Sequence, residues 1–239
     1  MIATGKISVM RHVHSIVLLG GLAAALMGCA TPPLQPFVYE YSKPKLDPSG
    51  SLVLAFSGMA DLRTDRNIDK VYANPPVEEV NNILAQEIMS TGLFKDVVRL
   101  PGILEEGHKE SKLKTADLHL KAALLVMKWE VPNYESIVRN AFVVSLLTGG
   151  VGGVMYGSSN TDVFGHARMQ LLVKDQRTNV VLIEKEYIGV VKENMIKFQC
   201  DTAETKARMV SLAVKDLIEK VKLDLVSTAT SAKPQASGQ

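Results

Sequence analysis

The chain lacks most of the features that point directly to catalysis or to metal binding. Its 239 residues include only two cysteines, and no pair of histidines has metal-ligand spacing. There is no Gly-x-Ser-x-Gly nucleophile motif, and no local pair of carboxylates of the kind that glycosidases use. We therefore expect no metal, no cofactor and no enzymatic activity.

Charge of one sign is not concentrated anywhere along the chain. The formal net charge is +2, and Lys and Arg alternate with Asp and Glu, so no nucleic-acid partner is expected. The hydrophobic share of 46% is ordinary for a globular protein and is enough for a packed core.

The N-terminal segment has the layout of a secretory signal. Lys6 and Arg11 precede an unbroken apolar run from Ile16 to Met27. A permanent membrane helix needs roughly 20 apolar residues, so this shorter run favours a cleaved leader. The run ends in a short motif made of Leu26, Met27, Gly28 and Cys29.

This motif resembles the bacterial lipobox, in which the cysteine is diacylated and becomes the new N-terminus. The resemblance implies that residues 1–28 are a lipoprotein signal peptide and that Cys29 is the membrane anchor. The alternatives are an ordinary secretory signal with an incidental cysteine and a signal anchor that is never cut. Ala30 stands where an aspartate would resemble an inner-membrane retention signal, so we expect the outer membrane, with the protein facing the periplasm. If Cys29 is acylated, Cys200 has no partner and no internal disulfide is expected.

Residues 29–49 allow two interpretations. Five prolines disfavour regular hydrogen bonding and predict a tether. At about 3.1 Å per residue, an extended tether of this length would lift the domain several tens of Å from the bilayer. Phe37, Tyr39 and Tyr41 alternate, however, and this pattern also fits an edge strand docked on the domain.

Residues 50–226 predict a single α/β (α+β) domain, with a mixed sheet of about four to five strands packed by two amphipathic helices. The apolar patterns predict strands near 51–60, 94–100, 118–129, 164–174 and 180–191. One helix is expected between a cap at Asn74 and Gly92, and a second after an Asp201–Glu204 capping box. Residues 227–239 predict a disordered tail.

For two further segments, the sequence leaves open what covers or contacts their side chains. In the strand that starts at Leu118, the side chains of Leu125, Met127 and Trp129 make the second face apolar too, so something is expected to cover it. The charged segment from Asp61 to Asp69 is either a loop that grips a partner or a solvated loop with local ion pairs.

The most unusual stretch is an apolar, glycine-rich insertion at residues 140–160. It lacks the Gly-x-x-x-x-Gly-Lys pattern of a phosphate loop, so nucleotide binding is not expected. It fits either a hairpin that inserts into a membrane or a neighbouring subunit, or, as we favour, a flap over the apolar strand face. The candidate partner or oligomer surface comprises Phe142, Leu146, Leu147, Gly150, Gly152 and Tyr156.

The order of elements, with Thr91-Gly92-Leu93-Phe94 after the first helix and Ala116-Asp117 before the long strand, resembles the small α/β domain of several envelope lipoproteins. These are the curli-secretion-channel lipoproteins, the lipoprotein activators of penicillin-binding proteins, and the N-terminal domain of the Tol translocation protein. The resemblance implies a binding or assembly module.

We therefore expect a non-enzymatic outer-membrane lipoprotein that presents its domain to a periplasmic or peptidoglycan-associated protein and scaffolds or regulates an envelope complex. The main alternative is a subunit of a homo-oligomeric export channel, with the glycine-rich insertion as its ring-forming or inserting element. An enzyme that acts on the cell wall ranks last.

Overall fold

The computed structural model describes residues 34–43, 50–100, 113, 115–149 and 151–232, with side chains up to residue 229. All of them belong to one compact unit that begins at Leu34. The predicted signal peptide, Cys29 and Gly150 lie outside the described residues, as does the end of the predicted tail.

The centre of the domain is a five-stranded mixed sheet, as the sequence predicts. The strands are β1 (Leu52–Asp61), β2 (Phe94–Arg99), β3 (Leu118–Glu130), β4 (Asn160–Asp175) and β5 (Val181–Ile196). Their order across the sheet is β2-β1-β3-β4-β5. β1 pairs in parallel with β2 and β3, whereas β3, β4 and β5 pair antiparallel.

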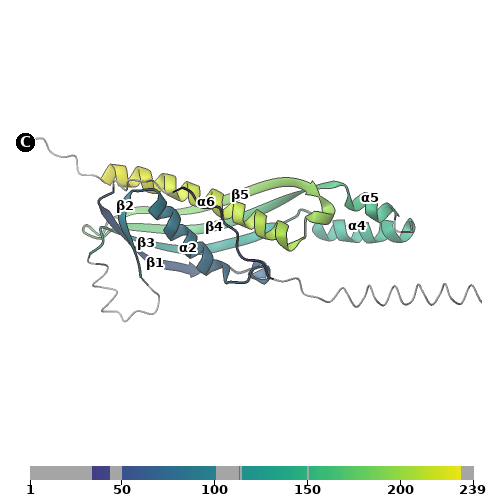
Figure 1. Cartoon of the computed structure of the whole chain (residues 1–239), viewed down its shortest axis with the longest axis horizontal. Helices are drawn as coiled ribbons and strands as arrows, with labels where there is room; N and C mark the ends of the chain where they lie inside the picture. The colour runs from purple at the N-terminus through teal and green to yellow at the C-terminus, as the bar shows by residue number, and fades with distance from the viewer. Residues whose placement is uncertain (1–33, 44–49, 101–112, 114, 150, 233–239) are drawn as a thin grey trace, which may run out of the picture. The chain divides into compact units, whose positions relative to one another are not determined.

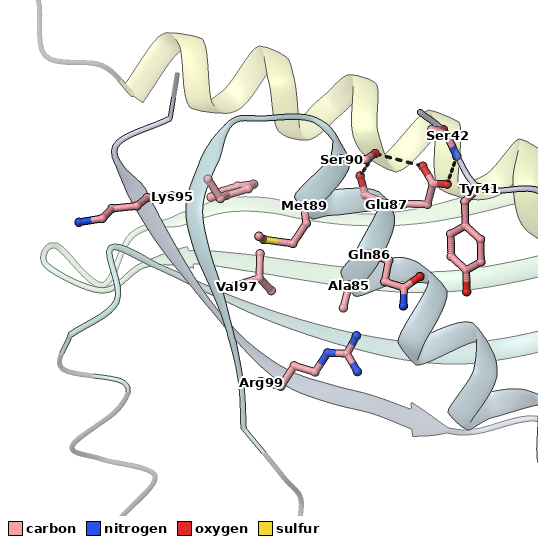
Figure 2. Close-up of a pocket in the computed structure, with 11 residues that line it drawn as sticks. Tyr41, Ser42, Ala85, Gln86, Glu87, Met89, Ser90, Lys95, Val97 and Arg99 are labelled. Carbon is pink, nitrogen blue, oxygen red and sulfur yellow. Dashed lines mark hydrogen bonds between the residues drawn. The ribbon is translucent and has the colours of Figure 1, made fainter. Parts of the chain in front are cut away.

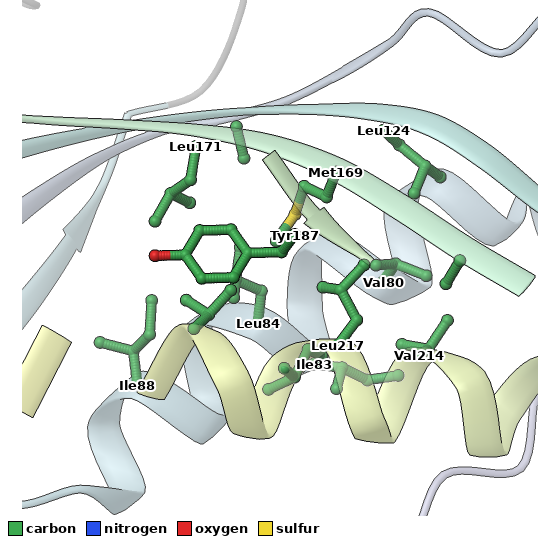
Figure 3. Close-up of a cluster of buried hydrophobic side chains, with 14 of the residues drawn as sticks. Val80, Ile83, Leu84, Ile88, Leu124, Met169, Leu171, Tyr187, Val214 and Leu217 are labelled. Atoms are coloured by element: carbon green, nitrogen blue, oxygen red, sulfur yellow. The ribbon is translucent and has the colours of Figure 1, made fainter. Parts of the chain in front are cut away.

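Two helices, α2 (Pro76–Ser90) and α6 (Ala203–Ala232), pack on one face of this sheet (Figure 1). Their apolar side chains join those of the strands in one core, part of which is shown in Figure 3. The core contains Leu54, Phe56, Ile83, Leu84, Ile88, Leu120, Leu124, Met169, Leu171, Tyr187, Val214 and Leu217, all nearly or fully buried. The fold is therefore a two-layer α+β domain.

Glycines in β4 and β5 set how closely α6 approaches the sheet. A Cβ atom on Gly165 would lie 2.0 Å from the carbonyl oxygen of Met209, and one on Gly189 would lie 2.0 Å from that of Ala213. A Cβ atom does not approach a non-bonded backbone atom so closely, so the helix backbone rests directly on these two positions. Any side chain there would have to push α6 away.

The expectation that the second face of β3 is apolar is wrong for two of its three residues. A bulge in the pairing of β3 with β4, between Leu124 and Val126, shifts the alternation by one residue. Met127 is therefore on the core side at 1% exposure, and Trp129 packs against the core from the same side. No flap is needed to cover them.

The helix ends also differ from the predicted ones. Helix α2 begins at Pro76 without a side-chain cap, so Asn74 does not cap it, although Gly92 has the expected positive φ of 67° after its end. Thr202, rather than Asp201, caps α6, because its hydroxyl accepts a hydrogen bond from the amide of Thr205 at 3.1 Å. Helix α6 then continues to Ala232, beyond the predicted start of the tail.

The segment 34–43 lies along the helices instead of extending away from the domain. Its start is fixed by a parallel bridge between Gln35 and Tyr72, and the ring of Phe37 contacts that of Tyr72 at 4.9 Å between centroids. Further on, the Glu40 carboxylate binds Lys215 and the Ser42 hydroxyl accepts from Lys222. The alternating aromatics thus mark a docked segment, as the second interpretation predicted, but on the helix layer and not at the sheet edge.

Candidate interaction surface

The glycine-rich insertion folds into a helical hairpin between β3 and β4. Helix α4 (Tyr134–Leu147) and the shorter helix α5 (Val151–Gly157) lie side by side at the end of the sheet (Figure 1). No residue of α4 is buried. The flap that we favoured from the sequence is therefore wrong, because the hairpin does not cover the strands.

Small residues allow the two helices of the hairpin to touch. A Cβ on Gly153 would lie 2.7 Å from the Cβ of Ser145, and one on Gly152 would lie 2.7 Å from a methyl group of Val144. Thr148 joins the helix ends, since its hydroxyl accepts from the amide of Gly152 at 2.7 Å. The glycines thus serve packing within the hairpin, so Gly152 belongs to its interior and not to its outer surface.

Several large apolar side chains of the hairpin point outward. Leu147 is 80% exposed, Met155 71% and Leu146 69%. We define the apolar tip as the six exposed side chains of Phe142, Leu146, Leu147, Val151, Val154 and Met155. The sequence contains no charged residue from Asn140 to Gly157. An exposed apolar cluster of this kind is typical of an interaction site.

The base of the hairpin carries aromatic rings with cations over them. The Nζ of Lys197 lies 3.7 Å from the ring centroid of Tyr156, and that of Lys206 lies 4.7 Å from the Trp129 ring. Trp129 also donates from its indole nitrogen to the carbonyl of Cys200 at 2.9 Å. Of the predicted surface, Tyr156 thus belongs to the base, whereas Phe142, Leu146 and Leu147 belong to the tip.

Cys200 lies in a small core at this base and behaves as a buried apolar side chain. It is 1% exposed and packs with Val131, Val163 and Met209. Burial, with the nearby Asp201 carboxylate, raises the pKa of its thiol. The thiol therefore stays protonated and poorly reactive.

A serine and a histidine that the sequence did not link meet on neighbouring strands. The Oγ of Ser57 lies 2.5 Å from the Nε2 of His119. Burial lowers the pKa of His119, and the cations of Lys121 and Lys174 lower it further. A base in a serine nucleophile couple needs a neighbour that stabilises the imidazolium, as a carboxylate does, and these lysines do the reverse. The pair fits a structural hydrogen bond.

His166 lies too far away to act with His119. His119 faces Lys174 across the β3–β4 ladder and His166 faces Lys128, which puts them roughly 27 Å apart along the strand. Within the described ranges, no group of three or more His, Cys, Asp or Glu side chains is arranged to hold a metal.

The segment from Asp61 to Asp69 is held together by Arg63, whose side chain is only 1% exposed. Its Nε donates to the Asp61 carboxylate at 2.9 Å, and its Nη1 donates to that of Asp69 at 2.8 Å. Local ion pairs, the second interpretation of this loop, are thus present. The buried guanidinium fixes the shape of the loop, and partner binding by its exposed residues stays a prediction.

We expect Arg63→Lys to lower the free energy of unfolding by about 1–2 kcal/mol, because a single ammonium cannot replace a planar fork that binds two carboxylates. Urea unfolding followed by circular dichroism would measure it. The matched control is Arg66→Lys, since Arg66 is 59% exposed and reaches Asp61 only at 3.5 Å. Equal, small losses of stability at both positions would show that the two ion pairs of the Arg63 guanidinium do not stabilise the loop.

A hollow of about 580 Å³ lies beside α2, β2 and the docked segment (Figure 2). The buried carboxylate of Glu87 lies at its edge. One oxygen accepts from the Ser42 amide at 2.7 Å and the other from Lys222 at 2.8 Å. Both oxygens are thus used within the domain, so this group serves the fold and not a ligand.

No family model matches the sequence, and no curated protein matches it. Among solved structures, a Xanthomonas campestris protein of family DUF330 is similar at a TM-score of 0.50 and 10% identity, over 84% of this chain and 99% of that one. The two chains share a fold. At this identity the similarity establishes the fold alone.

Two more distant structures are a PelC dodecamer from Paraburkholderia phytofirmans and the lipoprotein GNA1162 from Neisseria meningitidis. The first has a TM-score of 0.39 at 16% identity, over 77% of this chain and 94% of that one. The second has a TM-score of 0.36 at 9% identity, over 74% and 99%. Similarity at this level does not establish a common function.

Proposed function

We propose that the protein is a non-enzymatic, lipid-anchored module of the bacterial outer membrane that assembles or regulates an envelope complex from the periplasmic side. The observation that carries the proposal is the apolar tip: a well-packed domain presents six large apolar side chains on a helical hairpin whose residues 140–157 carry no charge. Such a surface needs an apolar partner.

The N-terminal sequence supports the anchor. The lipobox motif ends at Cys29, and several acyl chains, each contributing about 0.8 kcal/mol per buried methylene, hold a domain on a bilayer almost irreversibly. The docked segment begins at Leu34, five residues after Cys29. At up to about 3.6 Å per residue, the anchor lies within about 18 Å of Leu34, so it keeps the domain close to the membrane.

The surroundings of Ser57 and His119 support a binding role over a catalytic one. The two lysines beside His119 oppose the charge that a general base acquires during nucleophilic attack. Turnover of a cell-wall substrate that is lost in the His119→Ala variant would contradict the non-enzymatic proposal.

We expect Cys29→Ser to abolish acylation, because only a thiol forms the thioether. Mass spectrometry of the N-terminal peptide would show diacylglycerol on Cys29 in the natural chain and an unprocessed N-terminus in the variant, which would also leave the outer-membrane fraction. Cys200→Ser is the matched control and should keep the lipid. An unmodified Cys29 in the natural chain would overturn the anchor.

A second candidate function is a subunit of an oligomeric export channel, favoured by the same hairpin because it offers a ready contact to a neighbouring copy. In that case Gly152→Leu, which forces the hairpin helices apart, should reduce a ring-sized mass to that of one protomer. Light scattering of the acylated protein in mild detergent distinguishes the channel subunit from the module proposed first. A single protomer mass in the natural chain favours the lipid-anchored module proposed first.

A further inference from the structure

The described chain enters the domain at Leu34, and the position of Leu34 indicates what the apolar tip contacts. Gln35 pairs with Tyr72, whose hydroxyl donates to the carbonyl of Ala207 in the first turns of α6. Just before α6, the carbonyl of Cys200 accepts from Trp129 at the base of the hairpin. Leu34 therefore lies at the end of the domain from which the hairpin projects.

The rest of the docked segment runs away from this end. Glu40 binds Lys215, and Ser42 binds Lys222, so the contacts move steadily along α6 from its start. The chain therefore enters the domain, at Leu34, at the end that carries the apolar tip.

On this basis, and resting on the proposed anchor at Cys29, we infer that the apolar tip inserts into the acyl region of the membrane leaflet that holds the acylated cysteine. The hairpin would be a second attachment point that fixes the orientation of the domain. Its partner is a lipid surface and not a folded protein.

The lengths of the elements fit one leaflet. In the part of the chain that the structure describes, no helix is long and apolar enough to cross a membrane. Helix α4 has 14 residues and is about 21 Å long, against about 15 Å for half of a hydrocarbon core. Only its last turns and α5 need to enter the leaflet, and these carry the apolar tip.

The distribution of side chains around the tip favours lipid over a protein groove. At about 100° per residue, Phe142 and Leu147 lie about 140° apart around α4, and both are more than half exposed. A groove or a flat surface covers one side of a helix, whereas acyl chains surround it.

The base of the hairpin has the residues of a membrane–water interface. Trp129 packs edge-on against Tyr134, with 5.7 Å between ring centroids, and Tyr156 lies under the ammonium of Lys197. Tryptophan and tyrosine are enriched at the membrane–water interface, because their rings are apolar and carry one polar group. The hairpin's two charged residues, Glu135 and Arg139, are also in the first half of α4.

The test uses the full acylated chain and one environment-sensitive fluorophore on an introduced thiol. Acylated Cys29 has no free thiol and Cys200 is 1% exposed, so the Leu147→Cys variant is labelled at the tip. The matched control is Gln170→Cys, an exposed position on β4. Both proteins are added to preformed vesicles of phosphatidylethanolamine and phosphatidylglycerol, and aqueous dithionite reduces any label in contact with water.

We expect the label at 147 to be reduced about tenfold more slowly than the label at 170, because the acyl region excludes the charged reductant. Lipids with a spin label on the acyl chain should quench it. A label at Val138, nine residues earlier and about 13 Å back along α4, should be quenched less.

Equal reduction rates at 147 and 170 in vesicle-bound protein would place the tip in water and overturn the inference while leaving the anchor intact. Protection at 147 without quenching by the spin-labelled lipids would also overturn it, because a second copy or another protein would then cover the tip. Protein that fails to float with the vesicles overturns the proposed anchor, and this inference with it.

Discussion

Replacing Gly165 by alanine is expected to lower the free energy of unfolding by about 3 kcal/mol or more, because the new Cβ would overlap backbone atoms that cannot rotate away. The carbonyl carbon and oxygen of Met209 would lie at 2.6 and 2.0 Å from it. Helix α6 must therefore move off the sheet and lose contacts along the whole core. Urea unfolding followed by circular dichroism measures the loss.

Gly189 allows a second test of the same contact between α6 and the sheet. Its Cβ would meet the carbonyl of Ala213 on the same helix, one turn further on. A single displacement of α6 relieves both overlaps, so the double variant should cost at least about 1 kcal/mol less than the sum of the single variants. Gln170→Ala, on the exposed side of β4, is the control and should change stability by no more than about 0.5 kcal/mol. Strictly additive costs would show that the two glycines do not act through one helix.

The strands and the two packing helices could be predicted from the sequence because each buries one face. The alternation of Ala167, Met169, Leu171 and Val173 in β4 and the stripe of Val210, Val214, Leu217 and Val221 in α6 are local patterns that no distant contact overrides. Their agreement with the sheet and core confirms the predicted fold class.

What escaped prediction depends on contacts between distant residues. The bulge after Leu124 follows from the pairing of β3 with β4, and no residue in β3 alone marks it. The close approach of α6 to Gly165 and Gly189 exists only in the packed domain, so the strand sequences do not show which element lies against these glycines. Since isolated glycine in a strand pattern can mark a close backbone approach, these two positions did carry a usable signal.

The exposure of the candidate surface could be predicted in part, whereas its binding of a partner stays a prediction. Phe142, Leu146 and Leu147 are exposed together on α4, as expected of an interaction surface. Gly152 is part of the helix contact instead, because clustered glycines that suggest a flexible loop also let two helices touch. The link from Ser57 to His119 spans 62 residues and has no local signature.

The second large loss of stability is expected when Glu87 is replaced, because its carboxylate joins three separate parts of the domain. It is fully buried on α2 and binds Ser42 of the docked segment and Lys222 of α6. Glu87→Met should lower the free energy of unfolding by about 3–5 kcal/mol, since it leaves the Lys222 ammonium buried with less compensation. The double variant Glu87→Met, Lys222→Met should be more stable than this single variant, because neither charge remains. A double variant less stable than Glu87→Met would contradict this account.

The same contact predicts how stability depends on pH. Burial by itself raises the pKa of Glu87, but the hydrogen bonds from Lys222 and Ser42 outweigh it and hold the pKa below its ordinary value of 4.5. A carboxylate with a lowered pKa in the folded state stabilises the protein above its unfolded pKa, and this contribution disappears as the pH falls through the folded pKa. Urea unfolding of the natural chain and of Glu87→Gln should therefore show a constant gap near neutral pH that narrows below 4.5. A gap that widens on acidification would mean that Glu87 is protonated in the folded protein, and that Lys222 is neutralised by Glu219 alone.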